Sequence, residues 1–151
     1  MPQSLSAVYH HLVFSTKDRQ PFLAEADLRA RLHAYIAVAS REIDCHALQV
    51  GGVADHVHVL ARIGREIAQA EWVKELKRVS SRWLKTQCGA LADFQWQGGY
   101  AIFSVSPSNL DRVRTYVAEQ QSHHARFDYQ RELRTLLQRH GLAWDERHLW
   151  D

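Results

Sequence analysis

The order of strand-like and helix-like patterns limits the folds that this chain can adopt. Hydrophobic periodicity and composition predict the order strand, helix, strand, strand, helix, strand before the proline at position 107. The predicted elements, in chain order, are residues 8–15, 24–42, 46–50, 55–63, 66–87 and 100–106. This order predicts an α+β fold, a ferredoxin-like split β-α-β sandwich with a central antiparallel sheet and helices mainly on one face.

Two further helices are predicted after the last strand. Ser108, followed by Asp111, is typical of a helix N-terminus, and that helix is expected to run to about residue 123. The last helix is expected over residues 129–140, ending at Gly141. Because no linker rich in Pro, Gly or Ser divides the sequence, we predict a single domain over residues 1–151.

Composition excludes several classes of protein. The chain lacks the basic start and apolar core of a secretory signal, and no apolar run approaches the ~18 residues of a membrane helix. Two cysteines among 151 residues suit a reducing compartment, so we expect a cytoplasmic protein with no membrane partner. The net charge of +2 is too small for attraction to nucleic acid over the whole surface.

The third predicted strand carries two histidines, His56 and His58, separated by one valine. Successive side chains of a strand point to opposite faces, so both imidazoles lie on one face. Two such imidazoles can hold one divalent cation, and catalysis by that cation needs at least a third ligand. An amphipathic strand whose polar face happens to carry two histidines remains open, because the motif is short.

The helix predicted after Ser108 offers chemistry along one edge of its apolar stripe. Tyr116 and Gln120 are one turn apart, and His123 and His124 follow in nearly the same sector. A tyrosine near a cation and a phosphate can act as a nucleophile, and an amide oxygen is a hard ligand for Mg²⁺ or Mn²⁺. The same edge is equally compatible with packing, with His124 as a hydrogen-bonded core residue.

Taken together, these motifs resemble the single-tyrosine transposases of the His-hydrophobic-His (HUH) endonuclease superfamily. Those enzymes move small insertion sequences through single-stranded DNA intermediates. The resemblance covers most of the chain, and its parts occur in the family's order. They are residues 9–17 (YHHLVFSTK), 55–60 (DHVHVL), 96–100 (WQGGY) and 103–106 (FSVS), then Tyr116 with Gln120, His123 and His124.

The resemblance implies a metal site and a nucleophile. His56, His58 and Gln120 would bind Mg²⁺ or Mn²⁺, and Tyr116 would cut DNA through a 5′-phosphotyrosine intermediate. It also implies single-stranded DNA with hairpin ends as the substrate, and a homodimer in which active sites can be shared. Family members usually carry Asn before the glutamine, whereas this chain has Glu119, which the helical wheel turns away from the histidine pair.

Basic side chains suggest where DNA would bind. In the helix predicted over residues 66–87, several of them share an arc opposite an apolar stripe, and two more follow the first strand. The predicted DNA-binding residues are Lys17, Arg19, Lys74, Lys77, Arg78, Arg82 and Lys85. A solvated face whose charges complement the helix dipole would look the same.

Three alternative functions remain open at this point. The chain can be a domesticated relative that processes repeated extragenic palindromes, because such relatives share these motifs. A non-catalytic ferredoxin-like module can bind nucleic acid on the open face of its sheet, which predicts exposed aromatic pairs there and no metal. A phosphohydrolase of small nucleotides would need a further histidine motif after His58, where Val59, Leu60 and Ala61 follow instead.

Overall fold

The computed structural model describes residues 2–151 and is built on a four-stranded antiparallel sheet in the order β2-β3-β1-β4. This order confirms the predicted split β-α-β topology, because β3 pairs with β1 and β2, and β1 also pairs with β4. The strands are β1 (Tyr9–Ser15), β2 (His46–Gly52), β3 (His56–Arg62) and β4 (Ala101–Val105). The helices of four or more residues are α1 (Ala26–Glu42), α2 (Gln69–Lys85), α3 (Leu110–Ala118), α4 (Gln120–His123), α5 (Tyr129–Arg139) and α6 (Glu146–Leu149).

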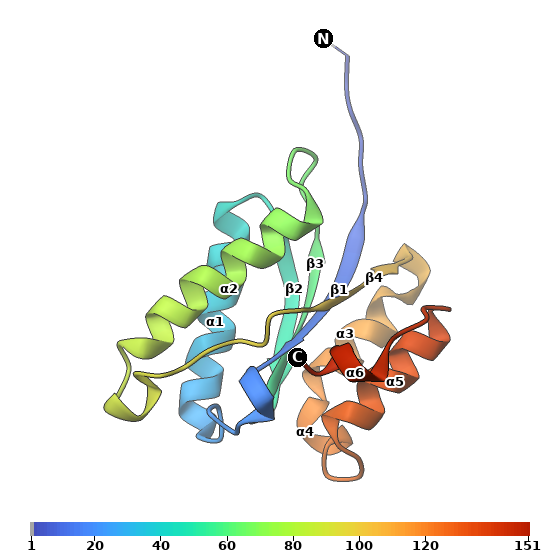
Figure 1. Ribbon diagram of the computed structural model, residues 1–151. Helices are drawn as coiled ribbons and strands as arrows, with labels where there is room; N and C mark the ends of the chain where they lie inside the picture. The colour runs from blue at the N-terminus through green and yellow to red at the C-terminus, as the bar shows by residue number, and fades with distance from the viewer. Residues whose placement is uncertain (1) are drawn as a thin grey trace.

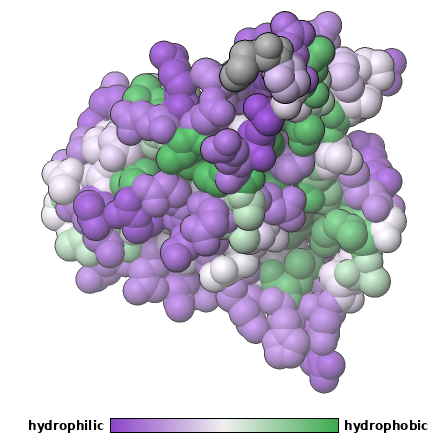
Figure 2. Space-filling model, turned by 90° about the horizontal axis from the view of Figure 1, so that it is seen from above, coloured by the Kyte–Doolittle hydropathy of each residue, from purple (hydrophilic) through white to green (hydrophobic). Residues whose placement is uncertain are grey.

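Helices cover both faces of the sheet (Figure 1). The crossover helices α1 and α2 share one core with side chains such as Leu12 and Val59. On the other face, α5 packs against Val13 and α3 packs against Leu60. The helices of the β-α-β units thus lie on one face as expected, and the C-terminal helices add a layer on the second. Seen from above, hydrophobic residues gather in a band across the middle, between largely hydrophilic surfaces (Figure 2).

Two local features of the C-terminal half differ from the sequence predictions. A 3-10 turn at Pro107–Asn109 precedes α3, so Asn109 takes the cap position and the Ser108 hydroxyl contacts Ser106 instead. The helix expected to reach residue 123 is broken at Glu119, which separates α3 from α4. None of the helices within residues 2–151 combines the length and the apolar character needed to cross a membrane.

Gly51 allows α3 to approach the sheet closely. A Cβ atom at this buried glycine of β2 would overlap the backbone carbonyl of Val117 in α3. Since α3 carries Tyr116 and leads into Gln120, this contact also sets the height of both side chains above the sheet.

We expect Gly51→Ala to lower the free energy of unfolding by about 2–3 kcal/mol, because either backbone must shift to admit the methyl group. Urea denaturation would measure the change. Gly98→Ala is the matched control, because nothing lies within 4 Å of the added atom, and it should cost far less. Equal stability of the two variants would show that α3 can move away without cost.

Candidate metal and tyrosine site

His56 and His58 lie on the face of β3 that α3, α4 and α5 cover, and both side chains are fully buried. Period 2 places them on that face together with Leu60, while Val57 and Val59 point into the core under α1 and α2. The two imidazole rings lie 5.1 Å apart between centroids. This part of the sequence prediction is confirmed, since both imidazoles occupy one face beside the C-terminal helices.

In each of these histidines, the Nδ1 atom contacts a polar atom of a neighbouring side chain. Asp55 Oδ1 lies 2.7 Å from Nδ1 of His56, and Nε2 of His11 lies 2.7 Å from Nδ1 of His58. His11 comes from β1 and is nearly buried. Because Nδ1 of each ring is engaged, the Nε2 atoms of both rings face a common centre, as in carboxylate-histidine-metal arrangements.

A carboxylate that the sequence analysis did not anticipate lies at that centre. Glu132, from α5, places Oε1 2.9 Å from Nε2 of His58 and 3.2 Å from Nε2 of His56. Its side chain is 1% exposed. The sequence does contain a signal for it, because Glu132 is the charged member of an otherwise apolar stripe formed by Tyr129, Leu133 and Leu136.

Gln120 reaches the same centre from the start of α4. Its Oε1 atom lies 3.1 Å from Nε2 of His56, and its Nε2 atom donates to the carbonyl of Tyr116 one turn earlier. His124 also borders the centre, with Nε2 3.1 Å from Gln120 Oε1 and 3.2 Å from Glu132 Oε1. His123 lies further out and packs against the ring of Tyr116, 4.6 Å away between centroids. Glu119 is exposed, as the helical wheel predicts.

Tyr116 completes the cluster from α3. Its hydroxyl donates a short hydrogen bond to Oε2 of Glu132, whose other oxygen contacts the two histidines. The phenol ring lies 5.7 Å from the ring of His58 between centroids. The histidine pair, the glutamine and the tyrosine therefore meet at a single place within one chain.

The charges of this cluster centre on an ionised carboxylate. Burial disfavours the charged form of Glu132, yet the imidazoles of His58, His124 and His56 hold the pKa of its carboxyl well below the usual range. Burial by itself would lower the pKa of His56, but the carboxylates of Asp55 and Glu132 raise it to about 9. Burial lowers the pKa of His58. Burial and the charge of Glu132 raise the pKa of Tyr116, so the phenol is protonated at neutral pH.

The donor set fits a divalent cation. The ligand atoms of His56, His58 and Glu132 all lie within 4.8 Å of one another, and Gln120 adds an amide oxygen beside them. Adjacent ligand atoms of an octahedral site with bonds of ~2.1 Å are about 3 Å apart, close to the separations observed here. Two nitrogen and two oxygen donors, one of them anionic, suit Mn²⁺ and also Mg²⁺.

The predicted DNA-binding residues fall on different sides of the molecule. Lys74, Arg78, Arg82 and Lys85 are exposed on α2. The sheet lies between α2 and the helices α3 and α5 (Figure 1). Lys77 is partly buried and donates to the carbonyls of Gln97, at 2.7 Å, and Gly99, at 2.6 Å. Lys17 and Arg19 form the 3-10 turn η1 (Lys17–Arg19) after β1, and Arg19 shares a pocket of about 610 Å³ with Asp55 and His124.

Comparison with known proteins assigns this chain to a family. Residues 4–120 match the family model of IS200-like transposases, and the chain therefore belongs to that family. A search among curated protein sequences found no match.

Two solved structures share the fold. A candidate transposase from Deinococcus radiodurans R1 is 18% identical, with a TM-score of 0.62 over 80% of this chain and 95% of the other. A REP-associated tyrosine transposase, solved bound to a REP hairpin, is 9% identical, with a TM-score of 0.60 over 82% of this chain and 72% of the other. Glu132 lies beyond the residues that the family model matches.

Proposed function

We propose that the protein is a transposase that cuts and rejoins single-stranded DNA, with Tyr116 as the nucleophile and a divalent metal as cofactor. The observation that carries the proposal is the meeting of the Tyr116 hydroxyl with the histidine pair through the one carboxylate of Glu132. A packing role for Tyr116 alone would not account for a buried carboxylate that joins its hydroxyl to two buried histidines.

The metal would be held by His56, His58, Gln120 and Glu132, with Asp55 and His11 fixing the two rings. When bound, a divalent cation polarises the scissile phosphate and stabilises the extra negative charge of its pentavalent transition state. Mg²⁺ or Mn²⁺ would serve this role. His124 contacts Gln120 and Glu132 and would orient the amide of Gln120, whereas His123 packs against Tyr116.

In the proposed reaction, the Tyr116 oxygen attacks the phosphorus of the scissile phosphodiester. A bond from the tyrosine oxygen to phosphorus forms while the bond from phosphorus to the 3′ oxygen breaks, leaving a 5′-phosphotyrosine. Glu132 accepts the hydrogen bond that orients the phenol before attack. The phenol proton is lost to solvent as the bond to phosphorus forms, and the departing 3′ oxygen takes up a proton to become a hydroxyl. Attack by another 3′-hydroxyl on the phosphotyrosine reverses these steps and joins new ends.

Single-stranded DNA with hairpin ends is the proposed partner, since the fold neighbour with a REP hairpin shows what this architecture can bind. We also propose a homodimer in which active sites can be shared, as the family resemblance implies. A host-domesticated role on repeated palindromes is compatible with the same chemistry. A module that binds nucleic acid on an open sheet face is disfavoured, because in residues 2–151 helices cover both faces.

The test is a covalent-adduct assay. Purified protein is incubated with end-labelled single-stranded hairpin DNA and Mn²⁺, and the products are separated on a denaturing gel. We expect a labelled species that migrates with the protein, survives denaturation and disappears after protease treatment. Chelator should prevent its formation. DNA binding without any adduct, across both metals and several hairpins, would contradict the proposed chemistry.

A further inference from the structure

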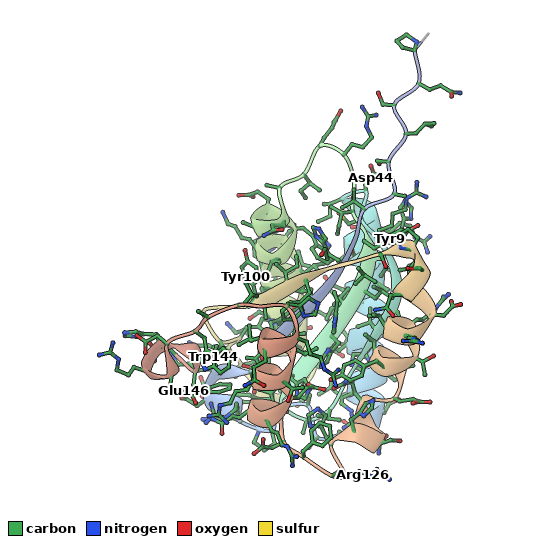
Figure 3. The ribbon with its side chains drawn as sticks, turned by 90° about the vertical axis from the view of Figure 1, so that its right-hand side faces the viewer. Tyr9, Asp44, Tyr100, Arg126, Trp144 and Glu146 are labelled. Carbon is green, nitrogen blue, oxygen red and sulfur yellow. The ribbon has the colours of Figure 1, made fainter. Side chains whose placement is uncertain are left out.

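The side chain of Tyr116 is partly exposed and lines two pockets. The first, of about 420 Å³, is bounded by β1, β4, α3 and α5 and includes Arg112 and Arg139. The second, of about 370 Å³, follows α5 and includes Arg131 and Arg139. Both pockets share Tyr116, Leu136 and Arg139, so they adjoin at the phenol, and we refer to the two together as the groove between α3 and α5. The side of the molecule formed by α3 and α5 faces the viewer in Figure 3.

The charge of this groove has one sign. The only carboxylate that lines either pocket, among residues 2–151, is Glu132, which is buried and engaged with the histidines. Arg112, Arg131 and Arg139 are exposed and take part in no ion pair of the described chain. The arginines that do pair with a carboxylate line neither pocket; these are Arg31, Arg78, Arg134 and Arg147.

Flat rings lie beside these guanidinium groups. The Arg131 guanidinium lies over the ring of Phe127, 5.5 Å from its centroid, in the second pocket. In the first pocket, His140 is stacked on Phe103, with ring centroids 4.3 Å apart. Alternation of arginines with aromatic faces is the combination by which proteins hold single-stranded nucleic acid, since every base has a face that can stack.

We propose that this groove between α3 and α5 binds the single-stranded segment that contains the scissile phosphate, with Arg112, Arg131 and Arg139 contacting phosphates on both sides of Tyr116. The inference rests on the proposed function and adds where the cut strand lies. The proposal assigns the cut strand to this groove and not to the exposed face of α2. The basic side chains of α2 lie across the sheet from Tyr116, so a strand held there cannot place its phosphate at the phenol without leaving that surface.

The test compares two DNA probes on full-length protein. One probe is a hairpin alone, and the other is the same hairpin with a single-stranded flank of about ten nucleotides. Binding is measured in chelator, so that no strand is cut, at several salt concentrations. The variant R112A/R139A should bind the flanked probe about tenfold more weakly, with a salt slope smaller by about 1.4, and should bind the hairpin alone as before.

Arg41→Ala is the matched control, because Arg41 is an exposed arginine near the end of α1, on the opposite face of the sheet. It should leave both probes unaffected. Unchanged binding of the flanked probe by R112A/R139A, or an equal loss on both probes, would overturn the groove.

These outcomes are independent of the adduct assay. If the wild-type protein forms the adduct but R112A/R139A binds the flanked probe normally, Tyr116 chemistry is supported and the proposed role of the groove is wrong. If no adduct forms but R112A/R139A weakens binding of the flanked probe alone, the groove is supported as a binding site and the proposed chemistry is wrong.

Discussion

Tyr116→Phe is expected to abolish the covalent adduct and to slow DNA cleavage by at least about a thousandfold, because it removes the attacking oxygen. Phenylalanine keeps the ring packed against His58, His11 and His123, so the fold and DNA binding should be retained. Denaturing gels with labelled DNA measure adduct and cleavage. A gel-shift assay in chelator measures binding. Loss of both cleavage and binding would mean that the variant acts through the structure instead of through the missing hydroxyl.

A second phenol near the histidines makes the control informative. Tyr129 is stacked on His56, with ring centroids 4.4 Å apart, and is 4% exposed. Because Tyr129 is nearly buried, its hydroxyl is poorly placed to reach a DNA phosphate, and we expect Tyr129→Phe to retain the adduct. Tyr35→Phe, on α1 and stacked on Trp83, reports on the general effect of losing a hydroxyl. If Tyr129→Phe lost the adduct while Tyr116→Phe kept it, the nucleophile would have to be reassigned.

His58→Ala should weaken Mn²⁺ binding by at least about a hundredfold and remove metal-dependent cleavage. Outer partners of metal ligands already contribute 10- to 100-fold to affinity, so loss of a direct ligand should cost at least as much. The variant also leaves Glu132 without its closest imidazole, at 2.9 Å. Isothermal titration with Mn²⁺ on metal-free protein gives the affinity, independently of DNA.

Glu132→Gln tests, in the same titration, how much the carboxylate contributes to Mn²⁺ binding apart from the histidines. The amide keeps the volume and can still accept from the Tyr116 hydroxyl, but it removes the negative charge at the centre. We expect affinity for Mn²⁺ to fall by about 10- to 100-fold. His46→Ala, an exposed histidine of β2 away from this cluster, should leave the affinity unchanged. Wild-type affinity in Glu132→Gln would exclude the carboxylate as a ligand and leave only the two histidines and Gln120.

The origin of Glu132 bears on how this chain compares with its family. The family model ends at residue 120, and Glu132 follows on α5, which packs over Val13 and Phe103 of the sheet. The Glu132 carboxylate of α5 thereby contacts both His58 of β3 and Tyr116 of α3. The C-terminal segment is thus part of the site as well as a cover for the second face.

Local periodicity was enough to predict much of this protein. The alternation of apolar residues in 55–60 put both histidines on one face. The four-residue spacing of Tyr116 and Gln120 predicted one edge of a helix, and both side chains reach the cluster although that helix is broken at Glu119. The order of strands and helices predicted the sheet topology, because few arrangements connect such an order without crossed connections. These features depend on neighbours within a few residues, and so they can be derived from the sequence alone.

Tertiary structure alone decided which distant side chains meet. The contact of Glu132 with His58 spans 74 residues, and the contact of His11 with His58 spans 47. The first depends on how α5 packs over the sheet, and the second depends on the register of β1 against β3; no periodicity encodes either. The basic side chains of α2 could be predicted from the sequence, but the position of the sheet between α2 and α3 could not. Local patterns fix the face on which a side chain lies, whereas packing of whole elements fixes which faces are brought together.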